Sequence, residues 1–170
     1  MPIRVESNSE YKIPIQHKNE AGKWETTDHL VFDTSDTGLT SRLFQMYDTI
    51  EQLTAKAEAD ARAIDERPDK PMRTLDEGED GERVLITQNQ YDGAQLIDKF
   101  YKDARAALDI FLGEGACQKI FKDKNYTEMF NDLLTQLKPE FAKMGLDAQK
   151  LRKTAAAKHK PNRAERRTLK

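Results

Sequence analysis

The chain of 170 residues has one cysteine, Cys117, and no long apolar run. A single cysteine excludes an internal disulfide and a zinc site built from several thiolates, and it is typical of a reducing compartment. No apolar run approaches the roughly 18 residues of a membrane-spanning helix. Met1 to Glu10 lacks the charged-then-apolar pattern of a secretory signal. We therefore expect a cytoplasmic protein that does not associate with membranes.

Apolar residues are also scarce. Hydrophobic residues make up 37% of the chain and charged residues 34%, whereas globular chains usually contain about 45–50% apolar residues. A modest core is expected, with part of the chain outside it. The length predicts one domain, or one domain with tails.

Charge is unevenly distributed, although the net charge is only −2. Residues 149–170 hold nine bases and one acid (+8), and the other 148 residues hold 19 bases and 29 acids (−10). The basic tail includes Lys150, Arg152, Lys153, Arg163, Arg166 and Arg167. Because no aromatic residue is interleaved there for base stacking, single-stranded nucleic acid is disfavoured as a partner. Non-specific phosphate contact, an acidic protein, the acidic body of this chain and a solvated terminus are the alternatives.

The pattern predicts an α+β fold, mainly α, in five segments. They are a β-hairpin unit at 1–38, a long helix at 39–66, an acidic flexible linker at 67–91, a helical bundle at 92–146 and a basic helical or disordered tail at 147–170. Tyr11 to His17 alternates with period two, and Trp24 to Phe32 is rich in aromatic and β-branched residues, which predicts two paired strands. Residues 3–5 are a candidate third strand.

The long helix has nearly heptad apolar spacing over its first half: Leu39, Leu43, Met46, Ile50 and Leu53. Asp36 or Thr37 is the expected N-cap. The second half is rich in alanine, so it should lie on the surface or meet a partner at close range. We expect a helix within a bundle rather than a coiled coil, because the heptads end early.

The linker is predicted from its prolines, glycines and clustered acids, which bury too little apolar surface to offset ordering entropy. Val84 to Ile86 is the exception, either a short strand returning to the N-terminal hairpin or a docking clip. In the bundle, Asp92 with Gln95 is the expected first cap. Gly113 and Gly115 end that helix. The remaining expectations are a turn at 116–121, a helix capped by Asn125 with Glu128, a further helix opened by Pro139 and interrupted by Gly145, and a basic helix at 147–159.

No catalytic, metal-binding or cofactor-binding constellation is found. A cysteine nucleophile needs a base, and the only histidines are His17, His29 and His159, which lie in strands or in the tail. The acidic run from Asp76 resembles a calcium loop, but Gly78 replaces the oxygen ligand of the third position and Thr87 replaces the bidentate Glu of the twelfth. We therefore predict a protein that is not an enzyme and needs no cofactor.

One stretch, Phe100 to Phe121, resembles the tail assembly chaperones of long-tailed, siphovirus-like bacteriophages. In that family a helix ends in an Asp-x-x-Phe-Gly-Glu-Gly-Thr-Cys-like turn followed by a Lys-x-Phe-Gly-Asp-like step. The matching residues here are Asp109, Phe111, Gly113, Glu114, Gly115, Cys117, Lys119, Phe121 and Asp123. Leu112, Ala116 and Lys122 depart from the pattern. The order of a small β unit, a long helix and a helical bundle is also similar.

The resemblance implies a role in virion morphogenesis. Such proteins bind the helical tape measure protein in the host cytoplasm, keep it soluble, give way to tail tube subunits, and are absent from the finished virion. Self-association along the client is a further expectation. A groove of adaptable apolar side chains suits a helical client. The candidates for client binding or ordinary packing are Met46, Phe111, Phe121, Met129, Phe130 and Met144. A structural tail or connector subunit, or a nucleic-acid regulator acting through the basic tail, are the alternatives.

Overall fold

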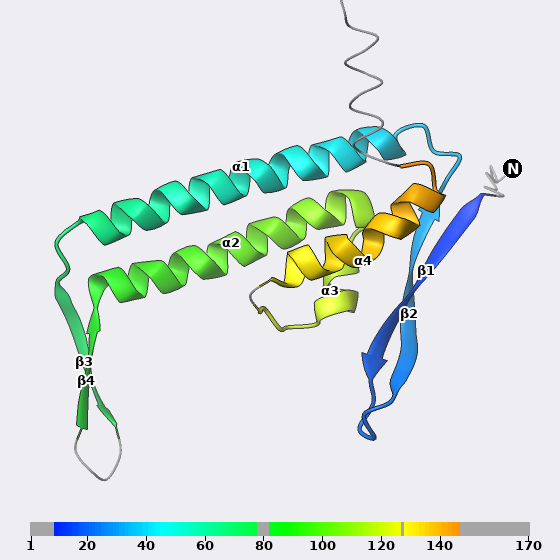
Figure 1. Cartoon of the computed structure of the whole chain (residues 1–170). Helices are drawn as coiled ribbons and strands as arrows, with labels where there is room; N and C mark the ends of the chain where they lie inside the picture. Colours follow the sequence, from blue (N-terminus) through cyan, green and yellow to red (C-terminus); the bar gives the residue numbers. More distant parts are fainter. Residues whose placement is uncertain (1–8, 78–81, 127, 147–170) are drawn as a thin grey trace, which may run out of the picture.

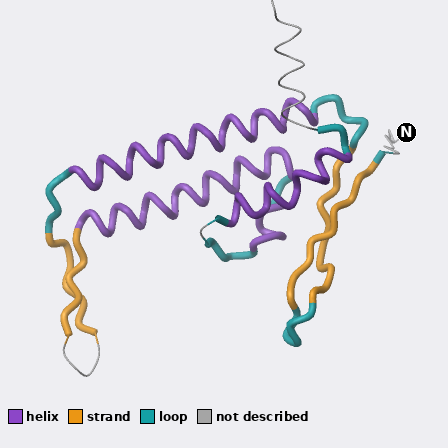
Figure 2. Tube along the Cα trace, viewed as in Figure 1, coloured by secondary structure: helices purple, strands orange, loops and turns teal. Residues whose placement is uncertain are grey.

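A computed structural model describes residues 9–77, 82–126 and 128–146. The protein is α+β and mainly α, as predicted. Two long antiparallel helices form an arm, two short helices and one β-hairpin gather at one end of it, and a second hairpin stands at the other end (Figures 1 and 2). The elements are β1 (Glu10–Lys18), β2 (Trp24–Asp33), α1 (Leu39–Glu66), β3 (Pro71–Glu77), β4 (Glu82–Thr87), α2 (Gln88–Leu112), α3 (Ala116–Phe121) and α4 (Met129–Lys143).

Strands β1 and β2 form the predicted N-terminal hairpin. They pair antiparallel from Glu10 opposite Asp33 to Lys18 opposite Trp24, with a register shift after Ile15. Because side chains alternate between the two faces, Ile15, Leu30 and Phe32 point inward and are buried. Among the described strands this sheet has two members only, so β1 has a free edge among them, and a proline such as Pro14 is tolerated on an edge strand. The possible third strand at 3–5 lies outside the described residues.

Helix α1 runs from Leu39 to Glu66 and ends before Pro68, but its N-cap is Gly38 rather than Asp36 or Thr37. Asp36 lies in the turn just before the helix and makes its contacts there. One of its carboxylate oxygens accepts from the Gly38 N–H at 2.7 Å, and the other pairs with Arg42 at 2.5 Å. The carboxylate therefore holds the turn that precedes the helix. Both interactions keep the pKa of Asp36 below its usual value.

Residues 67–91 are not the unstructured linker that we predicted. Strands β3 and β4 pair antiparallel there, so Val84 to Ile86 joins β3 and not the N-terminal hairpin. The helix ends bring the two strands together, because Asn89 donates to the Ile64 carbonyl and accepts from the Arg67 guanidinium. Because the ends of α1 and α2 already lie close together, closing the short β3–β4 connection costs little entropy and needs little apolar burial. Amino-acid composition alone does not reveal this proximity.

The start of α2 also differs from the prediction. Thr87 is the N-cap: its hydroxyl accepts from the Gln90 N–H, while the Gln90 side chain accepts from the Thr87 N–H. This is a capping box, located before the expected one. Asp92 lies inside the first turns of the helix and pairs with Arg67.

Helix α4 is continuous through Pro139, so the separate helix that we predicted to open there does not exist. Leu137 and Phe141 lie on the buried face on either side of the proline, and this packing holds the backbone helical despite the missing N–H. The N-cap is Glu128 without a side-chain cap, in place of Asn125 with Glu128. Gly145 ends the helix with a positive φ of 75°. The basic tail and its predicted helix lie outside the described residues.

The core is confined to one half of the molecule. In α1 the buried residues are Leu39, Leu43 and Met46, and in α2 they all lie between Ala104 and Leu112. Phe32, Phe111 and Phe141 form an aromatic triangle that joins β2, α2 and α4, with ring centroids 5.1–6.4 Å apart. The other half of the arm contains no buried side chain among the described residues. We call it the distal half; the described elements that pack on the core half, namely α3, α4 and the β1–β2 hairpin, do not add buried side chains to it.

Candidate helix-binding groove

The six residues singled out for client binding lie mostly in the core. Met46, Phe111, Phe121 and Met129 are at most 9% exposed, so none of them offers a surface to a partner in the folded protein. Phe130 and Met144 are partly buried and pack against the same core. Methionine and phenylalanine are common both in cores and in binding grooves, so the sequence does not distinguish the two kinds of position.

The turn that carries the family resemblance has a structural role. One carboxylate oxygen of Asp109 accepts from the Cys117 N–H at 2.8 Å and the other from the Gly115 N–H at 3.1 Å. Gly113 and Gly115 have positive φ angles of 103° and 72°, which side chains with a Cβ rarely adopt. Glu114 is exposed between them. The motif therefore closes α2 and starts α3.

Replacing Asp109 with alanine should lower the free energy of unfolding by about 1–2 kcal/mol, because two backbone N–H groups lose their acceptor. Urea unfolding monitored by circular dichroism measures the change. Asp98→Ala is the matched control on the same helix, since Asp98 is exposed, and it should change stability by less than about 0.5 kcal/mol. Equal effects at both positions would contradict this role for Asp109.

Cys117 is a buried thiol. It is 1% exposed, and its Sγ donates to the Arg105 carbonyl at 3.5 Å. Burial raises its pKa strongly, and the neighbouring Asp109 carboxylate raises it further. A thiol in this state does not form the thiolate that nucleophilic attack requires.

Alkylation of Cys117 by iodoacetamide at pH 8 should be at least about a hundredfold slower in the native protein than in urea. The thiol reacts only after local opening, and an opening free energy of about 3 kcal/mol corresponds to that factor. Mass spectrometry follows the reaction unambiguously because the chain has no second cysteine. Rapid native alkylation would show that this turn is open to solvent.

An open surface lies on the distal half of the arm. A groove of about 400 Å³ runs between α1 and α2 there. We call it the distal groove, and its lining residues are Thr54, Ala57, Glu58 and Ala61 from α1 and Leu96, Ile97, Phe100 and Tyr101 from α2. Ile97 is 57% exposed. One wall of the groove carries two alanines and the other carries large apolar side chains, and helices commonly pack ridges of side chains into such grooves.

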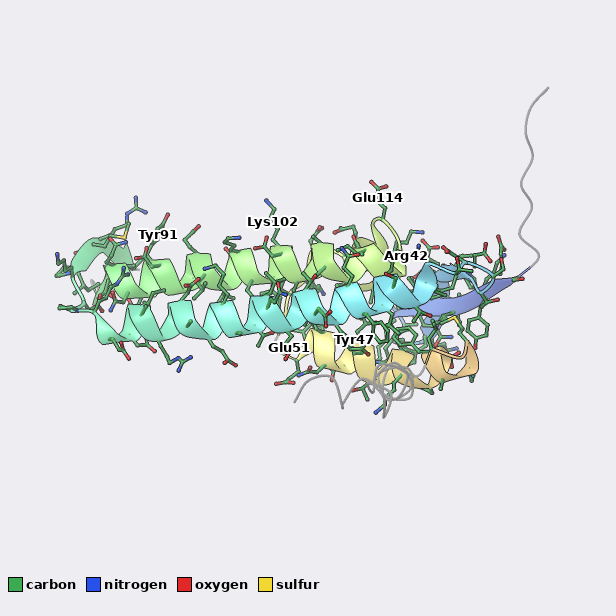
Figure 3. All side chains as sticks on the ribbon, turned by 90° about the horizontal axis from the view of Figure 1, so that it is seen from above. Arg42, Tyr47, Glu51, Tyr91, Lys102 and Glu114 are labelled. Carbon is green, nitrogen blue, oxygen red and sulfur yellow. The ribbon has the colours of Figure 1, made fainter. Side chains whose placement is uncertain are left out.

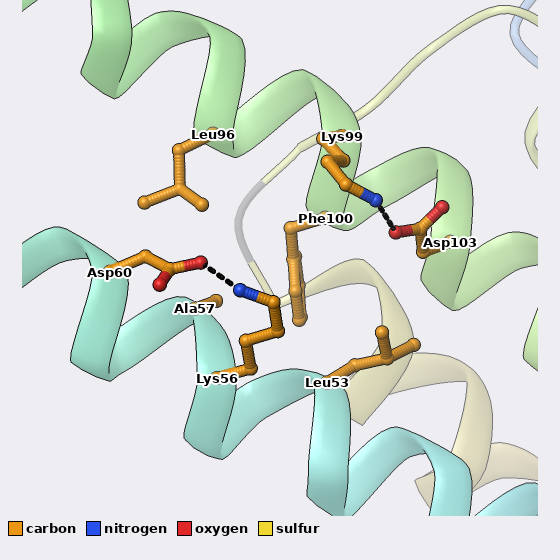
Figure 4. Close-up of a pocket in the computed structure, with 8 residues that line it drawn as sticks. All are labelled: Leu53, Lys56, Ala57, Asp60, Leu96, Lys99, Phe100 and Asp103. Atoms are coloured by element: carbon orange, nitrogen blue, oxygen red, sulfur yellow. Dashed lines mark hydrogen bonds and ion pairs between the residues drawn. The ribbon is translucent and has the colours of Figure 1, made fainter.

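The opposite side of the α1–α2 pair has no comparable groove at the same level of the arm. The space there is only about 30 Å³. Two ion pairs within single helices, Lys56 with Asp60 and Lys99 with Asp103, flank it (Figure 4). These charges neutralise each other, so this side offers neither room nor net charge to a partner. The two sides of the arm are therefore unequal.

Helix α4 covers the α1–α2 pair over the core half and begins where the distal groove ends. Phe130, in the first turn of α4, packs on Phe100 and Tyr101 with ring centroids 6.3 and 5.6 Å away. Both residues also line the groove. Figures 1 and 3 show α4 alongside the half of the arm that carries the core, and no other described helix lies over the rest of the arm. The distal groove thus continues the surface that α4 occupies.

Metal and membrane sites are not evident in the described residues. No three His, Cys, Asp or Glu side chains gather around a common point in residues 9–77, 82–126 and 128–146. None of the helices in those ranges combines the length and apolarity that crossing a membrane requires.

Two features of the sequence point toward the distal groove. One is the apolar face of α2, which supplies Leu96, Ile97 and Phe100. The other is the alanine-rich half of α1, which we expected to lie on the surface or to meet a partner closely. Neither feature by itself shows that the two faces meet along an open groove.

The fold and the groove define a small, mainly α protein built on a helical hairpin with an apolar groove along its distal half. The chain belongs to a family of unknown function, DUF6673, whose model matches residues 48–170. That range takes in most of α1 and all of β3, β4, α2, α3 and α4, and it excludes the β1–β2 hairpin. No curated protein and no solved structure matches the chain.

Proposed function

We propose that the protein is a phage tail assembly chaperone that binds the tape measure protein and keeps it soluble during tail morphogenesis. It then gives way to tail tube subunits, works in the host bacterial cytoplasm and is absent from the mature virion. It acts by binding alone, without catalysis or a cofactor. The distal groove is the proposed client site.

The observation that carries this proposal is the position of the groove in line with α4. An amphipathic helix binds a partner by laying its apolar face into a groove, and α4 already does this over the core half of the arm. A tape measure protein offers such helices over a great length. The resemblance of residues 100–121 to tail assembly chaperones supports the same assignment.

Contacts between copies belong to the proposal as well. Many copies are needed to cover one long client, and the edges of the β1–β2 hairpin, with which no other described strand pairs, are suited to pairing between neighbours. Trp24 and Val31, which are 63% and 50% exposed, lie on β2 and add apolar surface there.

Co-expression with the tape measure protein encoded nearby tests the proposal. We expect the client to become soluble and to co-elute with many copies of this protein on sizing. If the client aggregates while this protein elutes alone as a monomer, the proposal fails. Mass spectrometry of purified virions separates the nearest alternative, because a structural tail or connector subunit would be found there and a chaperone would not.

A further inference from the structure

The α1 edge of the distal groove is acidic. Glu51, Glu58 and Asp65 follow one another at seven-residue steps, so they lie along one edge of the helix. All three are exposed, and no salt bridge to another described residue involves them. Figure 3 shows Glu51 on the edge of α1 beside the start of α4. Arg62 lies next to this edge, and its Nε donates to the Glu58 carbonyl.

The α2 edge carries no balancing cation among the residues that line the groove. Its groove positions are Leu96, Ile97, Phe100 and Tyr101. Arg105, one turn further along, is held by the α3–α4 connection, where its guanidinium donates to the carbonyls of Lys122 and Lys124. Lys102 projects from the opposite edge of the arm (Figure 3). The distal groove therefore has one acidic wall and one uncharged apolar wall.

This asymmetry selects among occupants. A second copy of the chain that docked through the same groove would bring its own acidic α1 edge, so like charges would meet. A helix with bases along one side of its apolar stripe would meet the acids across the groove. The lining residues of α1 span about two helical turns, roughly 10 Å, so one short helical segment fills the site.

We infer that the distal groove binds an amphipathic helix in line with α4 whose apolar stripe is flanked by Lys or Arg on the side facing α1. The inference rests on the proposed function, because it specifies which tape measure helices are bound. Apolar side chains of the client pack between Ala57 or Ala61 and Ile97. Its bases lie beside Glu51, Glu58 and Asp65.

Two designed peptides of about 18 residues, with the same apolar stripe but Lys or Glu flanks, test the inference. Fluorescence anisotropy with the full chain measures both affinities at low and high salt. We expect the Lys peptide to bind at least about tenfold more tightly at low salt, with the difference shrinking as salt screens the charges. The triple variant Glu51→Lys, Glu58→Lys, Asp65→Lys should reverse the preference.

A matched variant separates a local effect from net charge. Glu20→Lys, Glu25→Lys, Glu114→Lys makes the same change in net charge at exposed positions away from the groove and should keep the preference for the Lys peptide. If both triple variants reverse the preference equally, or if the folded wild type binds neither peptide, the inference is overturned. Circular dichroism establishes that each variant is folded. Peptide preference without client solubilisation would uphold this inference and reject the proposed function.

Discussion

A Phe111→Ala substitution is expected to lower the free energy of unfolding by about 3–5 kcal/mol, the usual range for removing a buried phenyl ring. Phe111 is 3% exposed, and its ring lies 5.3 Å from that of Phe32 and 5.1 Å from that of Phe141. Removing it leaves a cavity where β2, α2 and α4 meet. Because domains are stable by only about 5–15 kcal/mol, the loss would be a large share of the total. Guanidinium unfolding measures it.

Ile110, the residue next to Phe111 in the chain, provides the control for the loss of a buried ring. Ile110→Ala removes an apolar side chain from the same turn of α2, but Ile110 is 37% exposed, so the change should be about 1 kcal/mol or less. If Phe111→Ala fails to fold, Phe111→Leu keeps most of the contact and gives a smaller, measurable loss. Equal losses at the two positions would show that Phe111 is not part of the core.

The helices were the most predictable part of the fold. Leu39, Leu43 and Met46 follow a spacing that only a helix places on one face, and the structure buries these three residues. The glycines after Leu112 mark the end of α2 for an equally local reason, since both adopt positive φ. Such features depend on neighbours in the chain, so the sequence alone contains the necessary information.

The β3–β4 hairpin was not predictable for the opposite reason. Its acids, prolines and glycines leave few apolar side chains in the segment, and such a composition favours a linker. The strands form because α1 and α2 pack antiparallel and bring Arg67 and Asn89 within hydrogen-bonding distance. This proximity arises from tertiary packing, about which local composition carries no information.

The distal groove could be predicted only in part. The apolar face of α2, including Leu96, Ile97 and Phe100, was visible in the sequence, as was the small-residue half of α1. What could not be read was where α4 packs on the arm: its first turn places Phe130 against Phe100, and the helix covers only the core half. Whether an apolar face is left open by the other described elements depends on this tertiary packing.

The second large expected effect is a loss of client binding when the distal groove is altered. Ile97→Gln should weaken binding of the tape measure protein by at least about tenfold, because burying an isoleucine side chain contributes about 1.5–3 kcal/mol and about 1.4 kcal/mol is a factor of ten. The variant should keep its stability within about 0.5 kcal/mol, since Ile97 is 57% exposed. Glutamine is a good helix former and adds no charge. The measurement is the fraction of co-expressed client that stays soluble and co-purifies.

Tyr91→Gln is the matched control for that experiment. Tyr91 is 44% exposed on the same helix, but it lies about 120° around the helix axis from Ile97 and is absent from the groove lining. Its replacement should leave client binding unchanged. Loss of binding in Ile97→Gln alone would locate the client in the distal groove. Unchanged binding in both variants would exclude the groove and direct attention to the β1–β2 hairpin, where Trp24 and Val31 offer the next exposed apolar surface.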